Sequence, residues 1–166
     1  MPANDSEQTV IGLRRSMGDL QDIQVKSFLK FIRYAEHGRE SDLVYGQIFG
    51  NTQTFSDMSK HPNIRVTAWG RTSTAAGAYQ ILFATWQEAV DKCIVRDFTP
   101  ASQDKIAIWK LQTRHALLHV QKGDIEHAIP LLRKEWTSMP GAAESKISMT
   151  QARELFNKYV KEYGGK

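Results

Sequence analysis

The stretch DIQVKSFLKFIRYAEHG, residues 22–38, sets the direction of the fold. Its apolar residues recur at helical spacing and form a broad stripe, which predicts an amphipathic helix that begins at Asp22. Gly38 ends the pattern, and glycine is the usual residue just past a helix because it adopts left-handed dihedral angles without a steric penalty. Glu36 and His37 are therefore expected at the C-terminal end of this helix.

The pattern changes after this helix from helical to extended. Leu43–Tyr45 and Ile48–Phe49 are β-like, residues 50–51 have turn chemistry, and residues 64–68 partly alternate between apolar and polar side chains. A small antiparallel sheet is predicted in this region.

The remainder of the chain is predicted to be helical, with boundaries marked by capping residues and glycines. The C-terminal stripe from Ala152 to Tyr163, ended by Gly164, is the clearest of these patterns. The other expected features are a helix opened by the capping box Thr85–Glu88 and running to about Ile94, a long helix from Pro100 towards Gln121, a helix capped by Asp124 and running to about Lys134, and a turn at Met139–Gly141. The order predicts an α+β fold that is mainly α.

Composition predicts one domain that folds on its own core. The 166 residues are 41% hydrophobic and 24% charged, with one cysteine, Cys93, so neither a disulfide framework nor a structural zinc is expected. Residues 1–21 are interpreted as a polar leader, and residues 22–166 as the folded domain. No charge-free stretch reaches the roughly 20 apolar residues of a membrane span. The net charge of +4 is mild, and no dense basic stripe indicates nucleic-acid binding.

Glu36 is the first candidate for chemistry. A carboxyl group at the end of an apolar helix, next to a polar β segment, stands where a core meets a cleft, and burial there raises its pKa towards the range of a general acid. The alternative is a solvated glutamate in the last helical turn. Glu40, Asp42 and Asp57 lie nearby in sequence, but spacing pairs none of them with Glu36, and each is interpreted as a loop charge or a turn cap.

Other catalytic chemistries find no support in the sequence. His115 and His119 are four residues apart on one predicted helix face, with His127 further on, but no third ligand is fixed nearby and no metal is expected. Serines and the cysteine lack a nucleophile motif, and there is no Gly-rich phosphate loop, so no cofactor is expected. Tyr79 and Gln80 form a pair suited to sugars, because aromatic faces stack on pyranose rings and amides bind their hydroxyl and acetamido groups.

The run STAAGAYQIL, residues 73–82, resembles a segment of the phage lambda endolysin family, the lambda lysozyme-like lytic transglycosylases. Further matches follow in the same order along the chain: Ala35-Glu36, FSDMSKHP at 55–62, FTPASQD at 98–104, KGDI at 122–125 and WTSMPG at 136–141. The resemblance implies a lysozyme-like, two-lobed domain with a small antiparallel β-sheet lobe and a helical lobe.

The resemblance also implies an activity. Members cleave the β-1,4 bond between N-acetylmuramic acid (MurNAc) and N-acetylglucosamine (GlcNAc) of peptidoglycan with formation of a 1,6-anhydro-MurNAc end. The family's single catalytic glutamate falls on Glu36, which serves as acid and then as base. Ser73, Thr74, Tyr79 and Gln80 fall on the substrate-binding segment. Asp57 and Asp104 fall on recurrent positions of the family, and we expect structural roles for them, as a turn organiser and a helix N-terminal charge respectively.

The expected partner is the glycan strand of bacterial peptidoglycan, bound by a monomer with no nucleic acid and no membrane insertion. The resemblance implies synthesis in the host cytoplasm without a signal peptide, and action on the periplasmic cell wall after holin-type release. This sequence has His37 where the family has a glycine, and the loop to Asp42 is shorter. Two other functions stay open: a hydrolytic muramidase that pairs Glu36 with Asp57 or Asp42, and a non-catalytic peptidoglycan-binding or virion structural protein.

Overall fold

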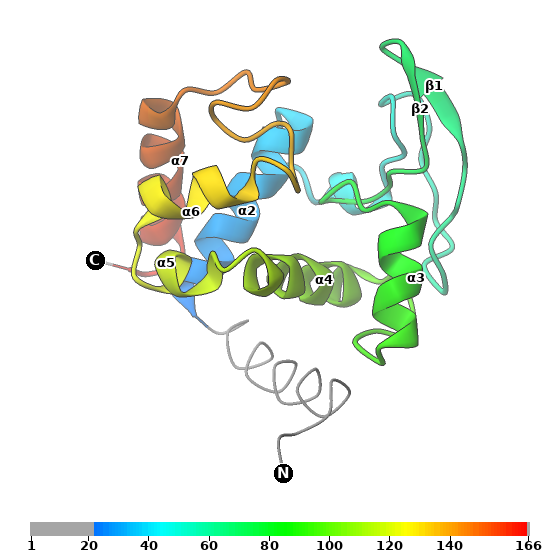
Figure 1. Ribbon diagram of the computed structural model, residues 1–166, viewed down its shortest axis with the longest axis horizontal. Coiled ribbons are helices and arrows are strands. Elements are labelled where there is room, and N and C mark those ends of the chain that lie inside the picture. Colours follow the sequence, from blue (N-terminus) through cyan, green and yellow to red (C-terminus); the bar gives the residue numbers. More distant parts are fainter. Residues whose placement is uncertain (1–21, 166) are drawn as a thin grey trace. The chain divides into compact units, whose positions relative to one another are not determined.

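The computed structural model describes residues 22–165, which divide into two compact units (Figure 1). The β unit comprises residues 41–106, and the helical unit comprises residues 22–40 and 107–165. The expected leader, residues 1–21, lies outside the described residues. Within residues 22–165, no helix is both long enough and apolar enough to cross a membrane.

Helix α2 (Ile23–His37) opens the helical unit and matches the prediction at both ends. The Asp22 side chain accepts a hydrogen bond from the Val25 N–H, and Gly38 follows the helix with a φ of +69° and donates its N–H to the Tyr34 carbonyl. Its apolar stripe packs against α7 (Met149–Glu162) and α5 (Leu117–Gln121). The centre of this packing is an aromatic cluster of the fully buried Phe28 and Phe31 with Phe156.

The long helix predicted from Pro100 to Gln121 is wrong as a single element. Helix α4 (Pro100–Thr113) ends eight residues early, His115 takes a φ of +60°, and α5 starts at Leu117. The break changes the direction of the chain so that Leu117 and the fully buried Val120 pack with α5 against α2. Apolar residues continue on both sides of the break, so the sequence contained no sign of it.

The rest of the helical unit follows local capping signals. Asp124 accepts a hydrogen bond from the His127 N–H at the start of α6 (Ile125–Leu132), which ends two residues before the predicted position. The predicted turn is confirmed, because Ala142 N–H donates to the Met139 carbonyl at 2.9 Å. Helix α7 ends before Gly164, as predicted, and begins three residues before the predicted stripe, at a capping box between Ser148 and Gln151 that the apolar pattern did not indicate.

The β unit contains the predicted antiparallel sheet, with only part of its expected content. Strands β1 (Val66–Ala68) and β2 (Arg71–Ser73) pair in the register Val66↔Ser73, Thr67↔Thr72, Ala68↔Arg71. The β-like run from Leu43 to Tyr45 instead lies in the 3₁₀ helix η1 (Asp42–Gly46). The Ser41 hydroxyl accepts a hydrogen bond from Leu43 N–H there, a local bond that favours a helical turn over a strand.

Helix α3 (Phe83–Asp91) begins two residues before the predicted capping box at Thr85. Its N-cap, Leu82, has no side-chain cap, and the Thr74 hydroxyl oxygen accepts the hydrogen bond from Phe83 N–H at 3.1 Å. The cap therefore comes from nine residues upstream, and the Thr85 prediction was wrong because a tertiary contact replaced the local one.

Candidate active site

Glu36 lies in the last turn of α2, as the sequence predicted, and its side chain is half-buried. The Ser138 hydroxyl donates a hydrogen bond to Glu36 Oε1 at 2.7 Å. A hydroxyl bonded to a carboxylate fixes the carboxyl group in one orientation, which general acid catalysis requires.

The segment that carries Ser138 is rigid because both of its ends are anchored. Trp136 and Met139 are buried on either side of Ser138, and Arg133 Nε donates to the Pro140 carbonyl at 2.8 Å. Gly141 has a φ of +86°, and a Cβ there would lie 2.5 Å from the Arg133 guanidinium. Sequence reasoning matched this segment to the family but missed the role of its serine.

Two of the three other candidate carboxylates, Glu40 and Asp57, are engaged in bonds of their own. Glu40 accepts from Lys158 Nζ at 2.9 Å and from the Tyr159 hydroxyl at 2.8 Å, and these two bonds lower the pKa of Glu40. Asp57 accepts from the backbone and the hydroxyl of Ser59, which lowers the pKa of Asp57 and confirms its turn-organising role. Asp42 is exposed in the first turn of η1.

The segment 73–82 is held in the β unit by Gln103 of α4 (Pro100–Thr113). Gln103 is fully buried; its Oε1 accepts from Ala78 N–H at 2.9 Å, and its Nε2 donates to the carbonyls of Tyr45 and Phe98. Gly77 passes so close that a Cβ would lie 2.2 Å from Gln103 Oε1, and its φ is +82°. Glycine is therefore required at this position by both space and backbone conformation.

Tyr79 departs from its expected role as a stacking side chain. It is fully buried, and its hydroxyl donates to Asp104 Oδ1, which also accepts from the Tyr45 hydroxyl at 2.8 Å. A buried ring cannot stack on a sugar, so in this structure Tyr79 supports the segment from within. Asp104 is likewise not a charge at the helix N-terminus, because it lies past the first turn of α4 and binds the two tyrosines.

The other predicted substrate-binding residues remain at the surface of the segment. Ser73, Thr74 and Gln80 are partly exposed. The Ser73 and Thr74 oxygens accept from backbone N–H groups, and Gln80 Nε2 donates to the Gly77 carbonyl at 3.0 Å. Gln80 has a φ of +48°, a strained backbone that persists where the surroundings determine it, often at functional sites.

The histidines do not share one helix face as predicted. His115 lies in the break after α4, and His119 lies on α5. His119 and His127 stack, with ring centroids 5.7 Å apart, and His127 Nδ1 bonds to Asp124 at 2.9 Å. In the described part of the chain, no group of three or more potential ligands is placed to hold a metal ion.

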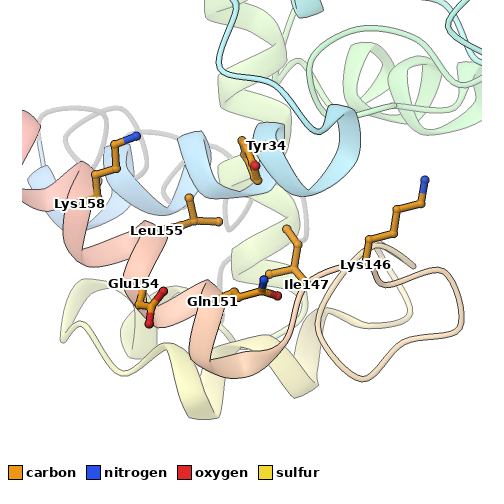
Figure 2. A pocket seen from close by; sticks show the side chains of 7 residues that line it. All are labelled: Tyr34, Lys146, Ile147, Gln151, Glu154, Leu155 and Lys158. Atoms are coloured by element: carbon orange, nitrogen blue, oxygen red, sulfur yellow. The ribbon is translucent and has the colours of Figure 1, made fainter.

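A pocket of about 390 Å³ lies in the helical unit, between α2, α7 and the loop before α7 (Figure 2). None of the predicted site residues lines it. Its lining combines an apolar side from Tyr34, Ile147 and Leu155 with polar side chains from Lys146, Gln151, Glu154 and Lys158.

A half-buried glutamate at the end of α2 and a small antiparallel sheet unit are the features that the sequence led us to expect of the lysozyme-like class. Residues 26–166 match the family model described as Endolysin. The endolysin of Escherichia phage lambda is 34% identical over 147 residues, covering 86% of this chain and 92% of that protein. The endolysin of Escherichia phage P2 is 36% identical over 110 residues, covering 63% of this chain and 67% of that protein.

Solved structures agree with the sequence relatives. The bacteriophage lambda lysozyme complexed with a chitohexasaccharide superimposes with a TM-score of 0.72 at 34% identity, over 86% of this chain and 95% of that one. A second structure, the lysozyme from bacteriophage lambda, also gives a TM-score of 0.72. The chain belongs to the endolysin family and has the lysozyme-like fold that the sequence predicted. It is thereby placed among enzymes that cleave peptidoglycan.

Proposed function

We propose that the chain is a peptidoglycan lytic transglycosylase in which Glu36 is the single general acid and base. The observation that carries the proposal is the placement of Glu36 at the end of α2, half-buried and bonded to Ser138. Glu40 is held by Lys158 and Tyr159, and Asp57 by Ser59, so both of these carboxylates have structural bonds of their own.

The reaction requires one group that both gives and takes a proton. Glu36 donates its proton to the glycosidic oxygen as the bond between the MurNAc anomeric carbon and that oxygen breaks. The C6 hydroxyl of the same MurNAc ring then attacks the anomeric carbon and transfers its proton to the Glu36 carboxylate. The enzyme returns to its starting protonation state, and no water is consumed. Attack within one ring gains from proximity, so no second carboxylate is needed.

We further propose Ser73, Thr74 and Gln80 as glycan-contacting residues, with Tyr79 as a positioning residue behind them. Hydroxyl and amide groups match the hydroxyl and acetamido substituents of the substrate. The segment's rigidity, which Gln103 provides through its bond to Ala78, would keep these groups in place when the glycan binds.

The proposal also covers the domain, the oligomeric state and the place of action. Residues 22–166 form the catalytic domain, which acts as a monomer on glycan strands in the periplasm after holin-type release from the cytoplasm. The chitohexasaccharide bound by the lambda lysozyme supports a β-1,4-linked amino-sugar chain as the substrate class.

The test is mass spectrometry of the soluble fragments released from purified sacculi. Wild type should release fragments with 1,6-anhydro-MurNAc ends, and Glu36→Gln should release none. Glu40→Gln is the matched control, because Glu40 is a neighbouring carboxylate in the same unit whose bonds go to Lys158 and Tyr159. It should keep the anhydro product.

Two outcomes would overturn the proposal. Reducing MurNAc ends, one water heavier, would identify a hydrolytic muramidase. Binding to sacculi without release of fragments by wild type would identify a glycan-binding or virion structural protein.

A further inference from the structure

Trp69 occupies a backbone position that does not suit it. Trp69 and Gly70 form the two-residue turn between β1 and β2, since Ala68 and Arg71 are the last paired residues. Their φ values are +51° and +76°. Two-residue hairpin turns with two positive φ angles strongly favour Asn-Gly or Asp-Gly, and a bulky residue with a positive φ is an outlier. The hairpin thus carries strain that asparagine in place of Trp69 would relieve.

The strain is not offset by burial of the indole. The Trp69 side chain is 71% exposed, whereas Trp86 and Trp136 are 8% and 5% exposed. Figure 1 shows the turn protruding from the β unit. Backbone strain that persists at an exposed residue points to a use other than filling the core.

The indole is nevertheless held in place. It meets the buried Phe49 edge to face, with ring centroids 5.4 Å apart and an angle of 87° between the rings. The Arg71 guanidinium lies 5.1 Å from the centroid of the same Phe49 ring. A Cβ on Gly50 would lie 3.2 Å from Ala68, so the hairpin packs closely on this segment. Fixing the indole in advance lowers the entropy lost when a ligand stacks on it.

The hairpin that carries the indole has exposed polar side chains. Thr67 and Thr72 are exposed and bond to each other through their hydroxyls at 2.7 Å. Arg71, which follows the turn, is also exposed, and its guanidinium lies over the same Phe49 ring that the indole meets. A bilayer surface would require several neighbouring apolar residues. A single rigid aromatic ring beside hydrogen-bonding groups is suited to a pyranose ring, which has an apolar face and polar substituents.

We propose that Trp69 is a sugar-stacking residue that adds a glycan contact on the β1–β2 hairpin, beyond the segment 73–82. The ligand is a pyranose ring of the glycan strand, stacked on the indole, with its hydroxyl, acetamido or carboxylate substituents within reach of Arg71. This inference rests on the proposed function for the identity of the glycan and adds a residue to its recognition.

The experiment measures binding separately from cleavage. Every variant is made in the full chain carrying Glu36→Gln, so that sacculi stay intact, and bound protein is quantified by pelleting with purified sacculi. Trp69→Asn should weaken binding about fivefold, the change that corresponds to ~1 kcal/mol of aromatic stacking. Trp69→Phe should keep most of the affinity, because the ring remains.

Two controls separate stacking from general effects. Leu43→Ala removes another exposed apolar side chain of the β unit, 74% exposed, and should leave binding unchanged. The thermal unfolding midpoint of Trp69→Asn should equal or exceed that of the parent, because asparagine suits the turn. Weaker binding with unchanged or higher stability cannot be attributed to misfolding.

Three results would overturn the inference: equal binding by Trp69→Asn and its parent, equal losses in Trp69→Asn and Leu43→Ala, or a Trp69 dependence seen only with anionic phospholipid vesicles. Failure of the proposed function would look different, since a wild-type chain that releases no fragments could still bind sacculi through Trp69. A chain that cleaves normally but binds independently of Trp69 would refute the stacking inference alone.

Discussion

Substituting alanine for Gly77 should test how the β unit holds its proposed glycan-contacting segment. The substitution has two costs. A non-glycine residue at a φ of +82° costs about 1–2 kcal/mol. The new Cβ would lie 2.2 Å from Gln103 Oε1, so the buried amide must move and its bond to Ala78 N–H is strained or lost, at about 1–3 kcal/mol.

The two costs together predict a loss of about 3 kcal/mol in the free energy of unfolding for Gly77→Ala. For a chain of this size that loss lowers the Tm by roughly 6–12 °C. Denaturant unfolding followed by circular dichroism would measure the free energy, and calorimetry would measure the Tm.

Gly38→Ala is the matched control for this prediction. Gly38 also has a positive φ, +69°, but an added Cβ there meets no atom within 4 Å. It should show the conformational cost alone, about 1–2 kcal/mol. If Gly77→Ala is no more destabilising than Gly38→Ala, the close approach of Gln103 is not the reason for glycine at this position, and the argument fails.

Three further predictions concern single side chains. Ser138→Ala should lower kcat on sacculi about tenfold by removing the bond that orients Glu36, whereas Thr137→Ala should not; equal effects would rule out a specific role for Ser138. Burial lowers the pKa of His61, so the unfolding free energy should fall as the pH drops below about 6.5, because the unfolded state takes up the proton first. Denaturant titrations at pH 7 and pH 5 should show a smaller fall in unfolding free energy for His61→Gln than for wild type. An identical fall in both proteins would contradict the role of His61. Asp104→Ala removes the acceptor of two tyrosine hydroxyls and should cost about 2–3 kcal/mol of unfolding free energy; a loss below ~0.5 kcal/mol would show that the pair is not structurally important.

Features encoded by neighbouring residues were predictable from the sequence. The bounds of α2 follow from Asp22 and Gly38, and the body and end of the last helix follow from apolar spacing and Gly164. The turn at residues 139–141 was equally predictable. These signals act over one helical turn or less, so a linear pattern contains them completely.

Features that depend on distant residues were not predictable. The start of α3 is set by Thr74, and the break before α5 is set by packing against α2. Apolar residues occur on both sides of His115, as they would in one continuous helix, so they do not indicate the break there. Local propensity is a weak signal, and tertiary contacts outweigh it.

The candidate site also has features that the sequence predicts and features that only the tertiary structure shows. The sequence by itself determined that Glu36 closes an apolar helix and that residues 73–82 form a distinct motif. Only the tertiary structure decided that Ser138, 102 residues away, orients Glu36, that Tyr79 faces inward to Asp104, and that Trp69 stays exposed on its turn. A helix end is defined by hydrogen bonds within four residues, whereas the partner and burial of a side chain depend on which distant segments pack around it.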